Sequence, residues 1–218
     1  MSYPLSIFKL EDIDLAVAIA TEIKFANIIF INNDEIETLP APVIISQEND
    51  IITMQGHLWK NNPLHNLLNN SEDNSIKCKI VFNAADCYIS PSIYAEKQTT
   101  GQVVPTWNYL TVQFDGRIYK SQTSELLNIL SKQTSEYENM VDSSWQLTDA
   151  PSEYTTKLSQ AIFGFKFIAD KFLVTAKMSQ NQSSQNIENI LDWYRQKDRR
   201  NRDLTYWHNM LKAEVTID

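Results

Sequence analysis

The sequence VVPTWNYLTVQFDGRIY, from Val103 to Tyr119, gives the clearest indication of the fold. The side chains from Val103 to Phe114 alternate between two faces, which is the period of a β-strand. Asp115–Gly116 then predicts a tight hairpin turn, and Arg117–Tyr119 predicts the return strand. The stretch therefore indicates an antiparallel sheet.

Further strands are predicted on both sides of this stretch. Runs rich in β-branched and aromatic residues indicate strands at residues 27–31, 36–46, 51–59, 76–82 and 87–90. Pro40 and Pro42 require an edge or a bulge for the second of these, because proline has no N–H for the ladder. A second hairpin is expected from Ile162 to Met178, with its turn near Asp170–Lys171.

Helices are predicted before, between and after the strands. Helical spacing and proline positions indicate helices at residues 11–25, 62–68, 124–137 and 152–159. Asn32–Asp34 indicates a turn between the first two strands. A last helix carries Ile187, Ile190, Leu191 and Tyr194 on one side. Since strands do not alternate regularly with helices, the order favours a mainly β (α+β) antiparallel barrel with peripheral helices.

The composition restricts the functions open to this chain. Only 4 of the 218 residues are glycine, where average usage of about 7% would give roughly 15. This scarcity argues against the glycine-rich phosphate loops of dinucleotide-binding and P-loop proteins. The net charge of −8 opposes binding to nucleic acid. The basic run Lys197–Arg202 is interpreted as a solvated helix face.

Cysteines, histidines and apolar runs also narrow the possibilities. Cys78 and Cys87 lack CxxC spacing and are interpreted as free, partly buried thiols. The sequence opens without a signal-peptide pattern and has no apolar run of the ~20 residues that span a bilayer, so a cytoplasmic protein without membrane contact is expected. His57, His65 and His208 lack metal-binding spacing, so no metal site is expected. His57, within a strand, is either structural or a ligand contact.

Three segments combine side chains that are typical of ligand sites. Residues 56–63 place Lys60 where a strand leads into a helix, which is either an anion site or a solvated lysine. Residues 88–94 and 101–109 alternate aromatics, hydroxyls and amides, as in a ligand pocket or in packed core and dimer contacts. Residues 177–181 offer one cation and several hydrogen-bonding groups, or simply a polar end to a hairpin.

Together these segments resemble the PaiB family of FMN-binding negative transcriptional regulators. Tyr88–Tyr94 (YISPSIY) and Val103–Tyr109 (VVPTWNY) carry the most specific part of the resemblance. Gly56–Pro63 (GHLWKNNP) and Lys177–Asn181 (KMSQN) match two further family segments. The resemblance covers most of the chain, from Tyr3 to Asn181.

The resemblance implies a split β-barrel of the FMN-binding type, formed by a homodimer with FMN in clefts between the subunits. Residues 1–182 would be this barrel domain, and residues 183–218 a C-terminal helical extension packed on it. The implied FMN contacts fall into three groups. They are His57, Lys60 and Asn61 for the phosphate; Trp107, Asn108 and Tyr109 with Ser90 for the ring and its polar edge; and Lys177 and Gln180 to close the pocket, from the same chain or its partner.

The sequence departs from the family pattern at three positions. Pro40, Ile93 and Gln182 stand where the family usually has histidine, tryptophan and arginine. The missing histidine and arginine are candidate donors to the phosphate or the ring. The departures therefore predict FMN binding that is weak or lost.

Three functions remain open. The leading one is an FMN-binding regulatory protein that affects transcription without direct DNA contact, because no helix-turn-helix pattern is present. The second is a flavin-dependent reductase or oxidase of the same barrel class, although the sequence indicates no proton-transfer pair beside the expected ring. The third is a haem-handling split barrel, which would need an axial ligand such as His57 or His208.

Overall fold

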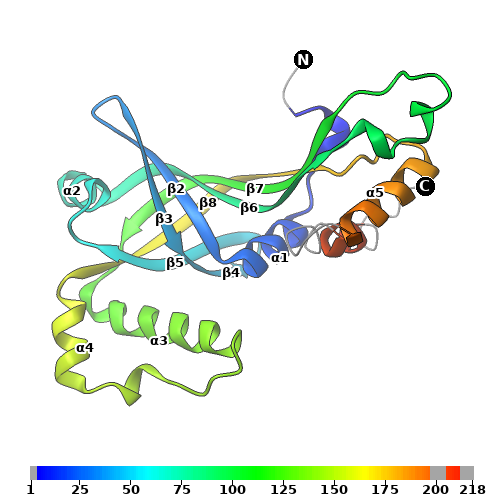
Figure 1. Cartoon of the computed structure of the whole chain (residues 1–218). Helices are drawn as coiled ribbons and strands as arrows, with labels where there is room; N and C mark the ends of the chain where they lie inside the picture. The colour runs from blue at the N-terminus through cyan, green and yellow to red at the C-terminus, as the bar shows by residue number, and fades with distance from the viewer. Residues whose placement is uncertain (1–3, 197–204, 212–218) are drawn as a thin grey trace. The chain divides into compact units, whose positions relative to one another are not determined.

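The computed structural model describes residues 4–196 and 205–211, and its strands form an eight-stranded antiparallel sheet. The strand order is β3-β2-β6-β7-β8-β5-β4 (Figure 1), and β1 pairs with β8 beside this path. The mainly β fold with peripheral helices is confirmed. The strands are β1 (Lys9–Leu10), β2 (Phe25–Asn32), β3 (Glu35–Pro42), β4 (Ile44–Glu48), β5 (Ile51–Trp59), β6 (Ser75–Ile89), β7 (Thr106–Lys120) and β8 (Ile162–Lys177).

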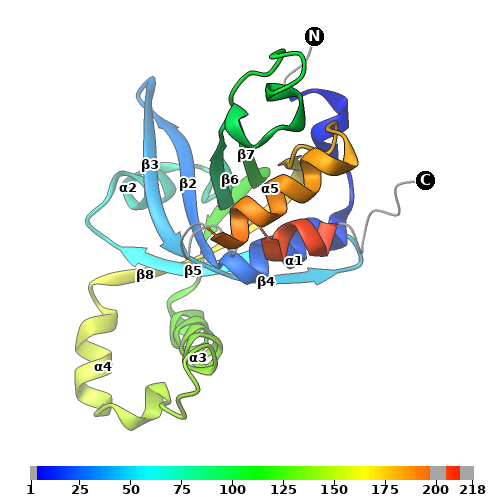
Figure 2. The same ribbon diagram turned by 45° about the vertical axis from the view of Figure 1, so that its right-hand side comes forward.

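Helices precede, connect and follow the strands. A helical stretch at residues 205–211, within the expected C-terminal helical extension, lies beside α5 (Figure 2). The basic run Lys197–Arg202 lies outside the described residues. Within the described ranges, no helix is long and apolar enough to cross a membrane. The helices are α1 (Ile13–Ile23), α2 (Pro63–Asn70), α3 (Thr123–Asn139), α4 (Ser152–Ser159) and α5 (Ser184–Gln196), with 3-10 turns η1 (Ser6–Phe8), η2 (Pro91–Ile93), η3 (Ala95–Lys97) and η4 (Leu147–Asp149).

Internal packing divides the chain into two compact units. Unit 1 consists of residues 1–15, 83–112 and 173–218, and unit 2 consists of residues 16–82 and 113–172. Strands β6, β7 and β8 contribute residues to both units. The division into a barrel domain of residues 1–182 and an extension of residues 183–218 stays a prediction.

The tight hairpins of unit 2 turn on Asn–Asp pairs. Asn33 and Asp34 join β2 to β3 with φ angles of 48° and 68°, and Asn49 and Asp50 join β4 to β5 with 48° and 66°. Two successive positive φ angles are typical of the type I′ turn, whose twist matches that of the flanking strands. The predicted turn at Asn32–Asp34 is confirmed.

The strand predicted at residues 36–46 is in fact two strands, β3 and β4. Pro40 and Pro42 supply no N–H to the ladder, and the Val43 N–H turns away to donate to the Lys24 carbonyl oxygen at 2.8 Å. β3 lies at one end of the strand order, as its prolines require, and β4 lies at the other end. Because Val43 alone separates β3 from β4, the two ends must lie close together, which is how a sheet closes into a barrel.

Neither hairpin predicted around β7 and β8 is present, because each of these strands is continuous. Asp115 lies within β7 and pairs with Lys79 Nζ of β6 at 2.8 Å. A side chain at Gly116 would overlap the Ile168 carbonyl oxygen of β8, so this glycine serves close strand approach rather than a turn. Asp170–Lys171 lies within β8, which pairs with β5 before that point and with β1 after it.

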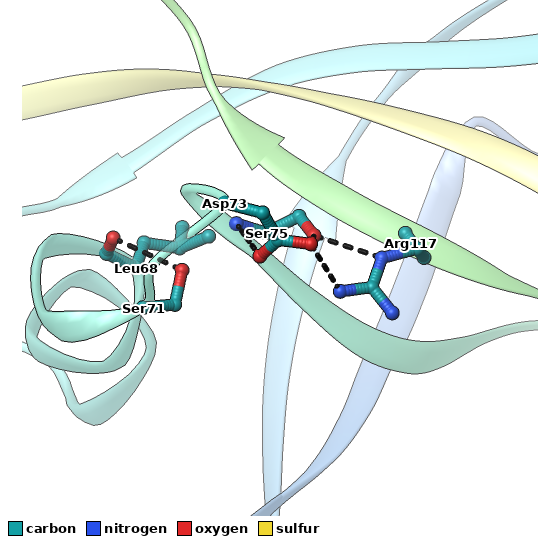
Figure 3. A network of polar contacts seen from close by, with 5 residues as sticks. All are labelled: Leu68, Ser71, Asp73, Ser75 and Arg117. Atoms are coloured by element: carbon teal, nitrogen blue, oxygen red, sulfur yellow. Dashed lines mark hydrogen bonds and ion pairs between the residues drawn. The ribbon is translucent and has the colours of Figure 1, made fainter.

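The two strands predicted at residues 76–82 and 87–90 form the single strand β6, which ends at Ile89, one residue before the predicted end. The residues between them contain neither glycine nor proline, so no backbone signal stops the strand. At its start, Arg117 of β7 donates from Nε to Ser75 Oγ at 2.8 Å and from Nη2 to Asp73 Oδ2 at 2.7 Å (Figure 3). Ser75 Oγ donates to the same carboxylate at 2.9 Å. The loop between α2 and β6 is thereby fastened to β7.

Helices α2 and α3 begin close to where the sequence predicts. Asn62 caps α2, because its Oδ1 accepts from the His65 N–H at 3.0 Å, and Pro63 is the first helical residue. The Glu125 carboxylate accepts from the Gln122 N–H at 2.9 Å and closes a capping box at the start of α3. Both helix starts therefore use side chains of their own residues as caps.

The core of unit 2 is aromatic. Phe82 and Phe114 are fully buried and meet edge to face, with ring centroids 6.0 Å apart. Met54 and Gly56 face the core from β5. Because alternate residues of a strand point to opposite faces, His57 lies on the other face of β5.

Candidate functional site

Asn108 of β7 lies at the centre of a buried polar network in unit 1. Its fully buried Nδ2 donates to the Tyr194 hydroxyl of α5 at 2.6 Å, and Ser179 Oγ donates to its Oδ1 at 2.9 Å. Burial raises the pKa of Tyr194 and the pKa of Tyr94, so both phenols keep their protons at neutral pH. Asn108 therefore joins β7 to α5 and to the turn that follows β8.

The turn after β8 is closed by the side chain of Gln180. Its Oε1 accepts from the Met178 N–H at 2.8 Å, and its Nε2 donates to the carbonyl oxygens of Ala176 at 2.7 Å and Ile7 at 3.0 Å. Ser179 takes a φ of 61° inside this turn. The Gln180 carboxamide is thus used within the protein, and it ties the N-terminal segment to the end of β8.

An exposed aromatic pair lies beside Lys177. The rings of Trp107 and Tyr88 meet edge to face with centroids 5.9 Å apart, and the residues are 53% and 44% exposed. Lys177 Nζ donates to the Trp107 carbonyl oxygen at 3.0 Å and to the Thr106 hydroxyl. No carboxylate of the described residues forms an ion pair with Lys177. A cation without a carboxylate partner, beside exposed rings, suits a planar anionic ligand.

Ser90 and Tyr109 lie in the same unit. Ser90 Oγ accepts from the Ser92 N–H at 3.2 Å and caps η2. Tyr109 is half-buried on the same face of β7 as Trp107. The predicted residues of unit 1 are Ser90, Trp107, Asn108, Tyr109, Lys177 and Gln180. Among these predicted residues, a hydrogen bond joins Lys177 to Trp107. The Asn108 and Gln180 side chains bond instead to residues outside the predicted set.

Helix α5 carries polar residues that the sequence patterns missed. Asn186 is only 2% exposed; its Oδ1 accepts from the Ala95 N–H at 2.9 Å and its Nδ2 donates to the Glu96 carboxylate at 2.8 Å. Asn186 shares an i, i+4, i+8 stripe with Ile190 and Tyr194. A polar residue on an apolar stripe is expected to be buried with hydrogen-bond partners, so this signal was present in the sequence.

His57 belongs to unit 2 and contacts α3. Its Nδ1 hydrogen bonds with Gln133 Oε1 at 2.7 Å, while Gln133 Nε2 donates to the Pro42 carbonyl oxygen at 3.0 Å. Because a carboxamide oxygen only accepts, neutral His57 carries its proton on Nδ1. Only Nε2 of His57 is left to meet a ligand.

Lys60 and Asn61 lie at the exposed end of β5, also in unit 2. Lys60 Nζ donates to the Gln160 carbonyl oxygen at 2.7 Å, and no ion pair joins it to a carboxylate of residues 4–196. Asn61 is exposed. The helix-end amide of His65, a candidate anion donor, is already occupied by Asn62 Oδ1. The Lys60 ammonium group and the exposed Asn61 side chain are therefore the groups that remain to bind a phosphate.

Metal ligands and reactive thiols are not gathered in the described part of the chain. No group of three or more His, Cys, Asp or Glu residues there has the arrangement to hold a metal ion. Cys78 and Cys87 are free thiols, and burial raises the pKa of Cys78 to about 12. Neither thiol has the lowered pKa of a nucleophilic cysteine.

Comparison with known proteins matches most of the chain to one family. The sequence model of the family described as “Putative FMN-binding domain” matches residues 2–171. An uncharacterized protein of Emericella nidulans is 31% identical over 164 residues, which cover 65% of this chain and 65% of that relative, just under two thirds of its length. The protease synthase and sporulation protein PAI 2 of Bacillus subtilis is 24% identical over 151 residues, with 69% of each chain covered.

A solved structure has the same fold. The FAD and heme binding protein of Mycobacterium smegmatis superposes with a TM-score of 0.54 at 10% sequence identity, covering 83% of this chain and 79% of that chain. At this identity the likeness concerns the fold alone. The chain therefore has the antiparallel split β-barrel fold and belongs to the family of FMN-binding domains, as a PaiB-like member.

Proposed function

We propose that this protein binds FMN, with the flavin ring against the exposed pair Tyr88 and Trp107. Family membership supports the cofactor, and the family match at residues 2–171 includes both aromatic residues. A flavin needs an apolar wall for its ring, polar groups at the ring edge and cations for its charge. The aromatic pair beside Lys177, which lacks a carboxylate partner among the described residues, is the observation that carries this proposal.

The other candidate residues of unit 1 take different parts in this proposal. Tyr109 and Ser90 are the proposed contacts at the polar edge of the ring. Asn108 and Gln180 act as positioning residues, because their carboxamides already bond to protein groups. They fix β7 and the turn that carries Lys177.

His57, Lys60 and Asn61 stay the proposed phosphate contacts. Lys60 and Asn61 are exposed, and His57 would take part through Nε2 because Nδ1 bonds to Gln133. The histidine and arginine that the PaiB family pattern has at residues 40 and 182 are absent. Fewer donors imply a lower FMN affinity than a complete site would give.

A fluorescence titration of FMN with purified protein tests the proposal. We expect the protein to quench flavin fluorescence, and Trp107→Ala to weaken binding by up to about tenfold, since an aromatic contact contributes about 0.5–1.5 kcal/mol. Trp145→Ala is the control, because Trp145 is also exposed, at 43%, but belongs to unit 2. A colourless protein that leaves FMN fluorescence unchanged would contradict FMN binding.

We also propose that the protein is a cytoplasmic homodimer that regulates transcription without touching DNA. The relative PAI 2 carries a name that refers to protease synthesis and sporulation, which supports a regulatory role. The net charge of −8 weighs against direct DNA binding. Light scattering tests the dimer, and DNA retention at low salt would contradict the proposed mode of regulation. Catalytic oxidation of NADH by the flavin-loaded protein would favour the reductase or oxidase alternative.

A further inference from the structure

A hollow in unit 2 lies where β5 and β7 end, α3 begins and β8 starts. Its volume is about 320 Å³, which falls within the range of roughly 300–1,000 Å³ for small-molecule sites. Lys60 and Lys120 lie at the strand ends, and Phe163 belongs to the start of β8. The lining combines cations, hydroxyl groups and apolar side chains.

Lys60 and Lys120 give this hollow its positive charge. Lys60 Nζ donates to the Gln160 carbonyl oxygen at 2.7 Å, and Lys120 Nζ donates to Asn69 Oδ1 at 2.6 Å. Both acceptors are neutral, no lining residue is acidic, and no carboxylate of the described chain forms an ion pair with either lysine. In a chain of net charge −8, two cations that share a hollow without an acid are available to an anion.

The start of α3 adds hydroxyl groups to the hollow. The Glu125 carboxylate accepts from the Gln122 N–H, and Lys60 and Lys120 are the charged side chains of the lining. The hydroxyls of Ser121, Thr123 and Thr156 line the hollow, and none of them bonds to another group of residues 4–196 or 205–211. These hydroxyls are free to donate to a bound oxygen.

The remaining lining of the hollow is apolar. Leu127 is 52% exposed, although it lies on α3 beside the buried Leu126. Ile162, at the start of β8, is half-buried in the lining. Phe163 itself is buried and packs against His65, with ring centroids 4.8 Å apart. A simple inorganic anion would leave this surface uncovered, and a neutral apolar ligand would leave the lysines unused.

We propose that the hollow binds a small amphipathic anion, with a phosphate or carboxylate head at Lys60 and Lys120 and an apolar body against Ile162 and Leu127. Phosphate and carboxylate oxygens accept charge-assisted hydrogen bonds from ammonium groups, and an aromatic or aliphatic body covers the apolar wall. This ligand is additional to the flavin and goes beyond the proposed function. Because Lys60 is also a proposed contact of the FMN phosphate, the test includes FMN.

His65 provides an independent signal for occupation of the hollow. The pKa of His65 is lowered, first by burial and then by the charges of Lys120 and Lys60. An anion between the two lysines offsets their field at the imidazole. Binding should therefore raise the His65 pKa.

Calorimetric titration of the full chain with phenyl phosphate tests the proposal. We expect phenyl phosphate to bind, inorganic phosphate to bind more weakly, and neutral benzyl alcohol to give no measurable binding. Lys120→Gln should weaken the binding of phenyl phosphate by about fivefold, since one charge-assisted hydrogen bond is lost in a partly solvated site. Lys157→Gln removes the same charge next to Thr156 but outside the lining, and it should bind like the parent. Benzoate in place of phenyl phosphate assigns the preferred head group.

An NMR titration of the histidine ring protons is the second measurement. Phenyl phosphate should raise the His65 pKa in the parent and in Lys157→Gln, and much less in Lys120→Gln. Equal binding by the parent and Lys120→Gln, or no binding of phenyl phosphate and benzoate, would overturn the proposal. If FMN but not riboflavin displaced phenyl phosphate, the hollow would be the site of the flavin phosphate, and the proposal of a separate ligand would be overturned. FMN binding is measured separately, by flavin fluorescence. A failure of FMN binding would therefore not contradict the proposed anion site.

Discussion

The Tyr194 hydroxyl is the partner of an amide that has no access to water. Asn108 Nδ2 donates to it at 2.6 Å, and both residues are fully buried. Tyr194→Phe leaves that N–H buried without its acceptor, so we expect the free energy of unfolding to fall by about 1–3 kcal/mol. Urea unfolding measures the change, and Tyr154→Phe, at a residue 59% exposed, should stay within about 0.5 kcal/mol of the parent. Equal unfolding midpoints for Tyr194→Phe and the parent would contradict this role.

The two thiols should react slowly in the folded protein. Burial, with the nearby Asp115 carboxylate, raises the pKa of Cys78 to about 12, so at pH 8 only about one molecule in ten thousand carries the Cys78 thiolate. Burial also raises the pKa of Cys87. In the variant Cys87→Ser, Cys78 is the remaining thiol. We expect a coloured thiol reagent to label Cys78 slowly in the folded variant and much faster once urea unfolds the protein. Rapid labelling of Cys78 without denaturant would contradict this expectation.

The sequence could supply the members of the candidate site but not their pairing. The strand period places Trp107 and Tyr109 on one face of β7, and the helical stripe places Tyr194 on the buried side of α5. The Asn108–Tyr194 bond joins residues 86 positions apart. Local patterns carry no information on such a pair, because only the packed helix and strand bring its two groups together.

Among the elements, β7 and β8 depend on glycine at their closest approach. A side chain at Gly116 would overlap the Ile168 carbonyl oxygen and press on the Phe167 ring. We expect Gly116→Ala to lower the free energy of unfolding by about 1–3 kcal/mol, the usual cost of overpacking. Asp170→Ala, at an exposed position within β8, is the control and should change it by less than about 0.5 kcal/mol. A Gly116→Ala protein as stable as the parent would mean that the strands can move apart freely.

The same glycine explains where element prediction failed. Asp115–Gly116 has the composition of a hairpin turn, yet it is ion-paired and packed within a continuous strand. The real turns, Asn33–Asp34 and Asn49–Asp50, use positive φ angles without any glycine. Turn-forming residues show which backbone conformations are accessible locally. Pairing with the neighbouring strand determines whether the chain turns there or continues as a strand.

The polar contacts of Arg117 with Ser75 and Asp73, which hold the α2–β6 loop against β7, should weaken in acid. The hydrogen bonds from Ser75, together with the charge of Arg117, hold the pKa of Asp73 below its ordinary value (Figure 3). A carboxyl whose pKa is lower in the folded state stabilises the fold above its unfolded pKa, and this contribution disappears as pH falls through the folded pKa. We expect Asp73→Asn to unfold at lower urea than the parent at pH 7, with the difference shrinking below about pH 4. A difference in unfolding midpoint that does not change with pH would show that the charge of Asp73 does not stabilise these contacts.

At the scale of the whole molecule, the chain path is what turns the sheet into a barrel. β3 and β4 lie at opposite ends of the strand order, but only Val43 separates them in sequence. The prolines of β3 predicted an edge or a bulge, and the order of strands and helices predicted antiparallel pairing. The element order predicted a barrel but not the place where it closes, because the break at Val43 depends on a hydrogen bond to the Lys24 carbonyl oxygen. Family membership, rather than composition, links this barrel to a flavin.

Helix α5 should be indispensable to unit 1. Ile190 and Tyr194 are 1% and 0% exposed, and Asn186 and Asn189 bond to residues of η2 and η3 or their flanks. Burying such apolar side chains contributes about 1.5–3 kcal/mol each, which is a large share of a total stability of about 5–15 kcal/mol. We therefore expect a chain ending at residue 182, which removes α5 together with the helical stretch at residues 205–211, to lose its cooperative thermal unfolding by circular dichroism. A chain ending at residue 211 keeps all of these contacts and should unfold like the parent. An equally stable 1–182 chain would make α5 and the helical stretch at residues 205–211 dispensable.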